Sequence, residues 1–295
     1  MPERRIETKA SRTADIVCMM RAASSLEKDP RLRTNDWVAR LLLPRLVQAI
    51  FVIPPFRRLI VRRLSPPGTY EWVIARTRYI DAIFTRVPEL GFSQVVFLGA
   101  GFDSRAIRFS SELKGLPIFE LDAPTTQAAK ISQYRKRKIN VPENLSFVGI
   151  DFEKQSLAQR LEEAGSRSGV KTLVVMEGVT QYLRPDAVHA ALQTLSAYVG
   201  SGSWLVFDYA HASAVGPGLD GKDEKRMAKS LEKSGETWQF GLEEDQLDPL
   251  LASYQFKVID QKNPHELEEI DFKNEEGKIS HHIIGVQSIV TAVKE

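Results

Sequence analysis

The sequence predicts an α/β fold in which a mostly parallel sheet carries helices on both faces. From about residue 94 onward, short apolar runs of strand length alternate with segments of helical periodicity. Of the 295 residues, 43% are hydrophobic and 26% charged, the balance of a globular protein with a sizeable core. A turn with Gly99 and Gly101 directly follows the first apolar run, as in many ligand-binding α/β proteins.

Seven strands are predicted, because strands buried on both faces of a parallel sheet form nearly continuous apolar runs. They cover residues 94–98, 117–121, 145–150, 172–176, 203–207, 256–259 and 282–293. Helices are predicted between the first five strands, at residues 104–113, 125–138, 157–164 and 185–199. The polar residues 263–278 are predicted to be a solvated loop.

The residues before the first strand are predicted to form a helical cap within the same domain. Helical periodicity covers residues 13–28, 36–50 and 70–87. We therefore divide the chain into a cap at residues 1–90 and a ligand-binding core at residues 91–295, with an insertion near residues 213–240. The insertion is rich in Gly, Lys and Glu, and it is expected to contain a helix.

The charge of the chain is unevenly distributed. Residues 1–63 hold 14 Lys and Arg against 6 Asp and Glu, whereas the remainder holds 26 against 32. These basic residues lack interleaved aromatic side chains, so nucleic-acid binding is not expected. The basic apolar segment around Arg57, Arg58 and Arg62 fits either a lipid surface or a cap over an active site, and we favour the cap.

Neither a membrane-spanning nor a secreted protein is expected. The most apolar stretch, residues 41–56, is interrupted by three prolines and an arginine, so it lacks the roughly 20 apolar residues of a spanning helix. The start of the chain has no apolar signal segment. Cys18 is the single cysteine, which excludes an internal disulfide and a cysteine cluster for metal, and it favours a cytoplasmic location.

The strongest local motif is the loop that contains Gly99, Gly101 and Asp103, between a buried strand and a helix. Glycines in such a turn let the backbone approach a ligand, and ligands of open α/β sheets bind at this carboxyl edge. A dinucleotide such as NAD is the alternative ligand. Ser104 stands where the dinucleotide motif requires its third glycine, which argues against NAD.

Acidic residues end the next three predicted strands. Asp122 follows the second strand at the spacing of a carboxylate that binds both ribose hydroxyls. Asp151 follows the third strand and offers an acceptor for an adenine amino group, beside the ring of Phe152. Glu177 follows the fourth strand and faces the same edge. Together these acids favour S-adenosylmethionine, which carries no phosphate.

Arg78, on the helix before the first strand, is the candidate for binding the carboxylate of that ligand. A guanidinium can hold a carboxylate through two parallel hydrogen bonds. The alternative role for Arg78 is a surface ion pair with Asp81, three residues further along the helix. The sequence leaves both roles open.

Four segments together resemble the leucine carboxyl methyltransferase family, which includes tetracenomycin-type polyketide O-methyltransferases. The segments are residues 76–81, 96–105, 119–124 and 177–183, and the resemblance extends over about residues 10–210. It implies a Rossmann-like class I methyltransferase fold. The implied sheet has seven mostly parallel strands with the last one antiparallel, and the N-terminal helices form a cap over the cofactor.

The resemblance also implies S-adenosyl-L-methionine as the cofactor. The residues that it assigns to this cofactor are Arg78 for the methionine carboxylate, Gly99 beside the methionine part, Asp122 at the ribose, Asp151 and Phe152 at the adenine, and Glu177 near the methionyl amino group. A basic residue near the start of the chain often contributes in this family. Lys9 and Arg12 are the two candidates.

The substrate side offers fewer indications. His211, just after the fifth predicted strand, is the candidate general base, and Tyr209 is the second candidate catalytic residue. Tyr182 and Tyr209 would either line an acceptor pocket or pack in the core. Trp238 and Phe240 would form an apolar lid or, as we favour, pack in the core.

These observations predict methyl transfer to an oxygen of a small, polyketide-like molecule. A carboxylate acceptor has an ordinary pKa of about 4 and needs no base, whereas a phenol with a pKa near 10 benefits from one. The alternatives are methylation of a protein C-terminus, an NAD-dependent oxidoreductase, and a cofactor-binding regulator without activity. The sequence does not determine the oligomeric state.

Overall fold

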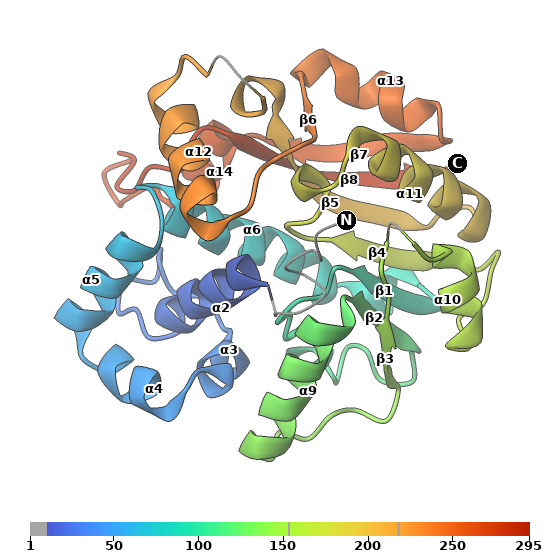
Figure 1. Cartoon of the computed structure of the whole chain (residues 1–295), viewed down its shortest axis with the longest axis horizontal. Coiled ribbons are helices and arrows are strands. Elements are labelled where there is room, and N and C mark those ends of the chain that lie inside the picture. The colour runs from blue at the N-terminus through green and yellow to red at the C-terminus, as the bar shows by residue number, and fades with distance from the viewer. Residues whose placement is uncertain (1–10, 153, 217–218) are drawn as a thin grey trace.

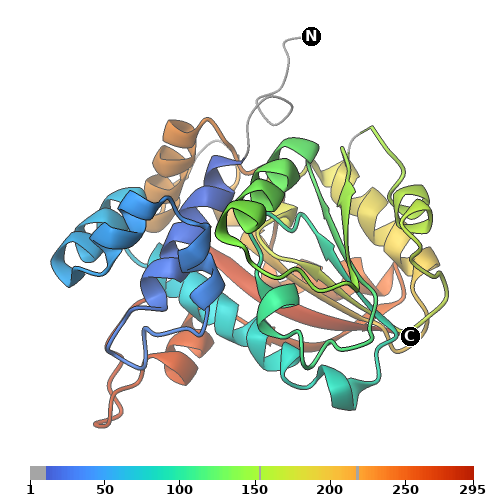
Figure 2. The same cartoon turned by 90° about the horizontal axis from the view of Figure 1, so that it is seen from below.

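Figure 1 shows a computed structural model of the chain, which describes residues 11–152, 154–216 and 219–295. A twisted sheet lies at the centre, with helices on both of its faces. The helices of residues 12–64 form a separate group beside the sheet, which Figure 2 shows from a second direction. The prediction of an α/β fold with a mostly parallel sheet is confirmed.

The sheet has the strand order β3-β2-β1-β4-β5-β8-β7, with β6 paired to β5. Strand β8 is antiparallel to both β5 and β7, as predicted for the last strand, and the other pairs are parallel. The strands are β1 (Gln94–Leu98), β2 (Ile118–Asp122), β3 (Leu145–Gly149), β4 (Thr172–Met176), β5 (Trp204–His211), β6 (Gly241–Leu242), β7 (Phe256–Lys262) and β8 (Gln287–Lys294). The prediction of seven strands was one short, because the two-residue β6 carries no apolar run of its own.

Strand β1 lies between β2 and β4. The chain adds strands on one side of β1 as far as β3, and from β4 onward it adds them on the other side, so the strand order reverses at β1. The loops after β1 and β4 therefore leave toward opposite faces of the sheet and open a crevice between them. The predicted ligand edge lies at this reversal.

The helices of the core follow the predicted pattern, with one clear difference after β1. Helix α9 (Pro124–Arg137), α10 (Leu157–Glu163) and α11 (Pro185–Tyr198) lie close to the predicted bounds. The predicted helix at residues 104–113 is limited to α8 (Arg105–Arg108), which continues as turns. The insertion contains α12 (Lys222–Ser234), and α13 (Leu247–Ala252) precedes β7.

The N-terminal region contains more helices than predicted. Helix α2 (Arg12–Ser24) is followed by α3 (Trp37–Leu42) and α4 (Arg45–Phe51), where one helix over residues 36–50 was expected. The break lies at Pro44, which lacks an N–H to continue α3. Helix α5 (Pro54–Leu64) has Pro at its start, and α6 (Thr69–Phe84) is followed by the short α7 (Val87–Leu90).

The prediction of a solvated loop at residues 263–278 was wrong in its first half, which forms α14 (Pro264–Asp271). Asn263 caps this helix by accepting a hydrogen bond from the N–H of Glu266 at 2.9 Å. The Glu266 carboxylate accepts in return from the N–H of Asn263 at 2.8 Å. This capping box, followed by the buried Leu267, is the feature of the sequence that was overlooked.

The predicted cap packs in two ways. Helix α6 lies against the sheet, and its Trp72 and Phe84 belong to the same hydrophobic cluster as β1. Helices α2 to α5 instead share a cluster with Phe102, Ile107 and Tyr134 of the core. Among the residues that the structure describes, no helix is long and apolar enough to cross a membrane.

Candidate functional site

A cavity of about 950 Å³ opens at the carboxyl ends of β1, β2 and β4. One part, which we call the strand-end part, is lined by Gly99, Gly101, Asp122, Asp151, Phe152 and Glu177. The other, which we call the helix part, is lined by side chains from α5, α6 and the α12 region, including Arg62, Ser65, Trp72, Met227, Leu231 and Trp238. Of the predicted cofactor residues that the structure describes, all except Arg78 line this cavity.

The turn after β1 requires its glycines. Gly99 has a φ of +70°, and a Cβ atom there would lie 2.4 Å from Cγ2 of Val179 in the loop after β4. Gly101 has a φ of +47°, and a Cβ atom there would lie 3.4 Å from Cβ of Ala14 on α2. The two glycines thus allow the β1 turn to approach both the β4 loop and the N-terminal helix.

Asp122 holds this turn from the end of β2. Its carboxylate accepts hydrogen bonds from the backbone N–H groups of Gly101 and Ala123. Burial raises the pKa of Asp122, and these two N–H donors oppose the shift. A carboxylate oxygen has two lone pairs, so acceptor capacity toward hydroxyl groups is left at the cavity.

The loop after β3 forms the next part of the wall. Asp151 lies partly exposed near Lys154, with a carboxylate-to-ammonium distance of 3.3 Å. Phe152 packs against the second hydrophobic cluster while it lines the cavity. An acid and an aromatic ring are therefore adjacent here, as the sequence predicted.

Glu177 is held between two buried guanidinium groups. Nη1 of Arg105 lies 2.6 Å from Oε2 of Glu177, and Nε of Arg76 lies 3.0 Å from Oε1. Burial raises the pKa of Glu177, but attraction to Arg105 and Arg76 outweighs it and holds the pKa well below its usual value. Glu177 is therefore ionised, and it offers a negative charge to the cavity.

Glu177 belongs to a continuous chain of ion pairs that runs from α2 to β5. Its members are Arg21, Asp36, Arg108, Asp81, Arg105, Asp103, Glu177, Arg76 and Asp208. These are five carboxylates and four guanidinium groups, so the ionised network carries one net negative charge. Such a site fits a cation better than an anion.

The structure corrects the prediction for Arg78. Its Nη1 pairs with Asp271 of α14 at 3.0 Å, and its Nη2 donates to the carbonyl oxygens of Pro30 and Arg33. Arg78 therefore lies away from the cavity, and its partner is not Asp81, which pairs with Arg105 and Arg108. Two residues along a helix correspond to a rotation of about 200°, which places Arg76 on the opposite side.

Arg76 was overlooked, although the sequence carries an indication of it. Trp72, Val73, Ile80 and Ile83 are buried on α6 at helical spacing from Arg76. An arginine within that apolar stripe must be buried, and a buried guanidinium needs carboxylate partners. Arg76 is 4% exposed and lines the cavity.

Asp208 was also overlooked. It is fully buried in the middle of β5, and it accepts hydrogen bonds from Nη1 of Arg76 and from the N–H of Gly178, each at 2.6 Å. It positions both the arginine and the loop after β4. An acid between Phe207 and Tyr209 in an apolar strand was the indication in the sequence.

The predictions of His211 and Tyr209 as catalytic residues are not supported by their positions. His211 lies at the end of β5 with Nε2 at 2.9 Å from Oγ of Ser288, and burial lowers its pKa. Tyr209 is buried in the second hydrophobic cluster, where its hydroxyl accepts from Gln261 at 2.8 Å. Neither side chain lines the cavity. Strand alternation turns Tyr209 away from the face that carries Asp208.

Three other aromatic predictions are resolved. Tyr182 and Trp238 line the helix part of the cavity, and Trp238 also packs in the first hydrophobic cluster. Phe240 is buried in the second cluster, in agreement with the favoured role in core packing. Burial raises the pKa of Tyr182 to about 12.

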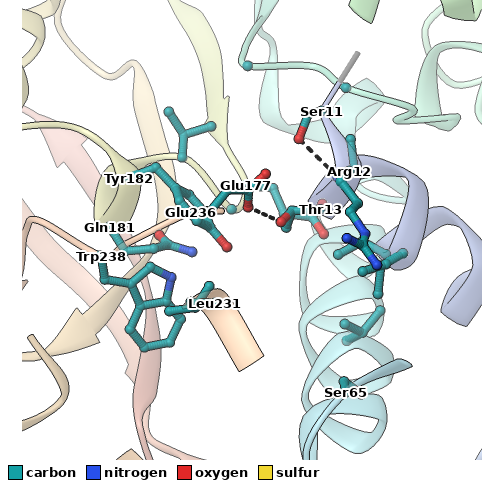
Figure 3. Close-up of a pocket in the computed structure, with 18 of the residues that line it drawn as sticks. Ser11, Arg12, Thr13, Ser65, Glu177, Gln181, Tyr182, Leu231, Glu236 and Trp238 are labelled. Atoms are coloured by element: carbon teal, nitrogen blue, oxygen red, sulfur yellow. Dashed lines mark hydrogen bonds between the residues drawn. The ribbon is translucent and has the colours of Figure 1, made fainter. Parts of the chain in front are cut away.

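Two segments meet across the cavity. Figure 3 shows Gln181, Tyr182 and Trp238 on one wall and Arg12 and Thr13 on the other. The Thr13 hydroxyl donates to the carboxylate of Glu236, and Nη1 of Arg12 lies 3.4 Å from the carbonyl oxygen of Lys233. The start of α2 is thus joined to the segment that follows α12.

Arg12 is one of the two basic residues proposed for the cofactor, and it lines the cavity. Within the described residues, no carboxylate lies at ion-pair distance from it. The other candidate, Lys9, lies outside the described residues.

The residues of the strand-end part fit S-adenosylmethionine. A glycine cradle replaces side chains where the methionine part would approach, and an ionised Glu177 faces it. The ligand carries one net positive charge, from a sulfonium, an ammonium and a carboxylate, which matches the negative network. Fold and site together define an S-adenosylmethionine-dependent methyltransferase.

Comparison with known proteins identifies the family. The sequence pattern of leucine carboxyl methyltransferase matches residues 14–196, more than half of the chain. The chain belongs to the leucine carboxyl methyltransferase family. The dinucleotide alternative is therefore set aside.

Two relatives and one solved structure illustrate the similarity. "Putative S-adenosyl-L-methionine-dependent methyltransferase YktD" of Bacillus subtilis (strain 168) is 27% identical over 236 residues, which cover 76% of this chain and 77% of that protein. A relative with the same description in Mycolicibacterium gilvum (strain PYR-GCK) is 29% identical, over 59% of this chain and 55% of its own length. This chain thus matches about half of that second relative. The crystal structure described as that of a "putative methyltransferase" from Thermobifida fusca YX has a TM-score of 0.61 at 14% identity, over 100% of this chain and 98% of its own.

Proposed function

We propose that this methyltransferase transfers the methyl group to the carboxylate of a small apolar acid. The observation that carries the proposal is the helix part of the cavity, where cations surround an apolar floor. Arg62 and Arg63 come from α5, and Arg226, Lys229 and Lys233 come from α12. The floor includes Val17, Met20, Val73, Met227 and Leu231. An acceptor with an apolar body and a negative group complements both features.

The kinds of side chain at the cavity support the same acceptor. Among the described residues, no histidine lines the cavity. Tyr182, with a pKa raised to about 12 by burial, stays protonated at neutral pH and can donate a hydrogen bond to an acceptor oxygen. A carboxylate is already ionised at neutral pH and needs no proton removal, whereas a phenol would.

For the donor, we propose that Arg12 binds the methionine carboxylate and Glu177 the methionyl ammonium. Asp122 would bind the ribose hydroxyls, and Asp151 with Phe152 would border the adenine. Arg12 takes the role first expected of Arg78, because its guanidinium lines the cavity without a carboxylate partner among the described residues. The peptide turn at Gly99 would lie against the methionine part.

The chain's own contribution to catalysis is orientation and exclusion of water. When bound, S-adenosylmethionine supplies an electrophilic methyl group for an in-line displacement. The contact between Thr13 and Glu236 spans the cavity, and it would help to keep water from the bound donor. The cations of α5 and α12 would hold the acceptor so that one carboxylate oxygen points toward the strand-end part, where the donor's methyl group would lie. Holding two reactants in line is worth several kcal/mol, on the order of 7–11 in favourable cases.

The acceptor class is tested with matched probes. The enzyme is incubated with S-adenosylmethionine and either 2-naphthoic acid or 2-naphthol, which share one ring system, and the products are identified by mass spectrometry. We expect a methyl ester from the acid and little methyl ether from the phenol. If the methyl ether is the main product, the acceptor is a phenol and the proposal of a carboxylate acceptor is wrong. If a protein phosphatase C-terminal peptide is methylated and neither small molecule is converted, the acceptor is a protein C-terminus and the proposal of a small acid is wrong.

The donor assignment is tested by calorimetric titration with S-adenosylhomocysteine. Arg12→Ala should weaken binding about tenfold to a hundredfold, because it removes one charge-assisted pair worth about 1.5–3 kcal/mol. Arg78→Ala is the matched control from the same region and should leave the affinity unchanged. Weaker binding in Arg78→Ala but not in Arg12→Ala would restore the assignment first made from the sequence.

A further inference from the structure

A basic and apolar surface covers the outside of α4 and α5. Its apolar members are Leu46, Val52, Ile53, Phe56 and Leu59, and its basic members are Arg45, Arg58, Arg62 and Arg63. We call this the α4–α5 surface. Its apolar side chains are between 45% and 73% exposed, and they are five of the eight large hydrophobic side chains that are exposed in the described part of the chain.

Helical geometry explains why these side chains face outward. On α4, Leu46 and Ala49 follow the spacing of one helical face, and on α5 Phe56, Leu59 and Arg63 do the same, while Val52 and Ile53 lie in the connection between the two helices. The opposite face of α5 is anchored by Arg57. Nε of this buried arginine lies 3.2 Å from Glu27, and Nη1 donates to the carbonyl oxygen of Phe51 at 2.8 Å. The helices are therefore packed through one face while an apolar face remains uncovered.

The charge of this region has one sign. Residues 37–70 contain six arginines and neither an aspartate nor a glutamate. Arg57 is compensated by Glu27. Among the described residues, no carboxylate lies at ion-pair distance from Arg45, Arg58 or Arg63. The complementary surface must therefore be negative throughout and must also accept apolar side chains.

We propose that the α4–α5 surface docks on an anionic lipid bilayer. A bilayer surface offers dispersed negative charge above an apolar interior, which matches arginines that flank exposed Phe, Leu, Ile and Val side chains. Each arginine near such a surface contributes favourably, and the attraction is screened by salt. Docking needs no spanning segment, which agrees with the helix lengths of the described residues.

The surface adjoins the cavity, since Arg62 and Arg63 belong to both. An apolar acid dissolved in the bilayer would meet the helix part of the cavity beside the docked helices. This consequence rests on the proposed function, whereas docking itself does not.

The test is flotation of the full chain with phosphatidylcholine vesicles that contain or lack phosphatidylglycerol. We expect binding to the anionic vesicles at low salt, and at least about tenfold less binding to neutral vesicles or in high salt. The double variant Phe56→Ser, Leu59→Ser should reduce binding at least about tenfold, as should Arg45→Gln with Arg58→Gln. Ile270→Ser is the matched control, because Ile270 is 63% exposed on α14, outside the surface.

Several results would overturn docking. One is that the wild-type chain does not bind to anionic vesicles. Another is that Ile270→Ser loses as much vesicle binding as the Phe56, Leu59 variant. A third is that the wild-type chain binds no vesicles but forms a dimer in light scattering, and that this dimer dissociates in the Phe56, Leu59 variant. That last result would assign the surface to a second copy of the chain. Binding of S-adenosylhomocysteine and methylation of an acid in solution should persist in the Phe56, Leu59 variant, so failure of docking is distinguishable from failure of the proposed function.

Discussion

At the ends of β1, β2 and β4 the cavity wall consists of backbone turns and buried ion pairs, whereas between α5 and α12 it consists of side chains on helices. In the strand-end part, Glu177 and Asp122 each have two or more partners among their neighbours. In the helix part, Arg62 and Lys229 have exposed or partly exposed side chains. The first part is fixed by mutually dependent ion pairs and hydrogen bonds, whereas the cations of the second part stand at exposed positions of helices.

This difference separates two tasks of one enzyme. A buried network tolerates little change, because removal of one charge leaves its partners uncompensated. A wall of helical side chains changes by substitution without disturbing the sheet. We infer that the strand-end part keeps the donor constant, while the helix part sets the acceptor.

The largest expected effect is on stability. Arg105→Ala removes a fully buried guanidinium from Asp81, Asp103 and Glu177, and it should lower the free energy of unfolding by about 3–5 kcal/mol. Urea denaturation measures this change. The control is Lys273→Ala, which removes an exposed pair with Glu269 and should cost at most about 1 kcal/mol. Similar losses in both variants would show that the network does not stabilise the strand-end part.

The next effect concerns the turn. Gly99→Ala places a methyl group where Val179 lies 2.4 Å away, so affinity for S-adenosylhomocysteine should fall on the order of tenfold to a hundredfold. Gly115→Ala is the matched control, because Gly115 has a φ of +80° but no atom within 4 Å of the added Cβ. It should lose stability, by about 1–2 kcal/mol, and keep its affinity. Titration calorimetry of both variants decides the matter, and unchanged binding in Gly99→Ala would contradict the close approach.

A smaller effect should separate the two parts of the cavity. Trp238→Ala removes an aromatic wall from the helix part, so KM for the acceptor should rise about tenfold from lost apolar burial of about 1.5 kcal/mol. The affinity for S-adenosylhomocysteine should change less than about twofold. Parallel steady-state kinetics and calorimetry test this. An equal loss for both ligands would mean that the two parts are not independent.

The smallest expected effect is on the pH profile of kcat/KM, which should be flat between about pH 6 and pH 9. Tyr182 keeps its proton in this range because its pKa is raised to about 12. Glu177 keeps its charge because its pKa is lowered below the usual 4.5. Its contribution to stability is accordingly present above pH 4.5 and is lost as the pH falls through the lowered value. A rise of the rate through pH 7 would indicate a base and thus a phenol acceptor.

Much of the fold was predictable from local patterns. Strands β1 and β4 were predicted with the observed bounds, because both of their faces are buried and every residue after the first, Gln94 or Thr172, is apolar. Helix α14 and strand β6 were missed. The former is specified by a polar capping box and the latter by two residues, neither of which produces hydrophobic periodicity.

The sequence by itself determined where the turn at Gly99 and the acids Asp122, Asp151 and Glu177 lie. Each lies at the end of an apolar strand or within a few residues after it, and the direction of that strand places the residue at the carboxyl edge of the sheet. Tertiary structure alone decided which arginine reaches the cavity. Arg76 and Arg78 are two positions apart, and the packing of α6 on the sheet turns one inward to Asp208 and the other outward to Asp271. It also decided the wall of the helix part, since α5 and α12 are more than 150 residues apart in the chain and meet only through the fold.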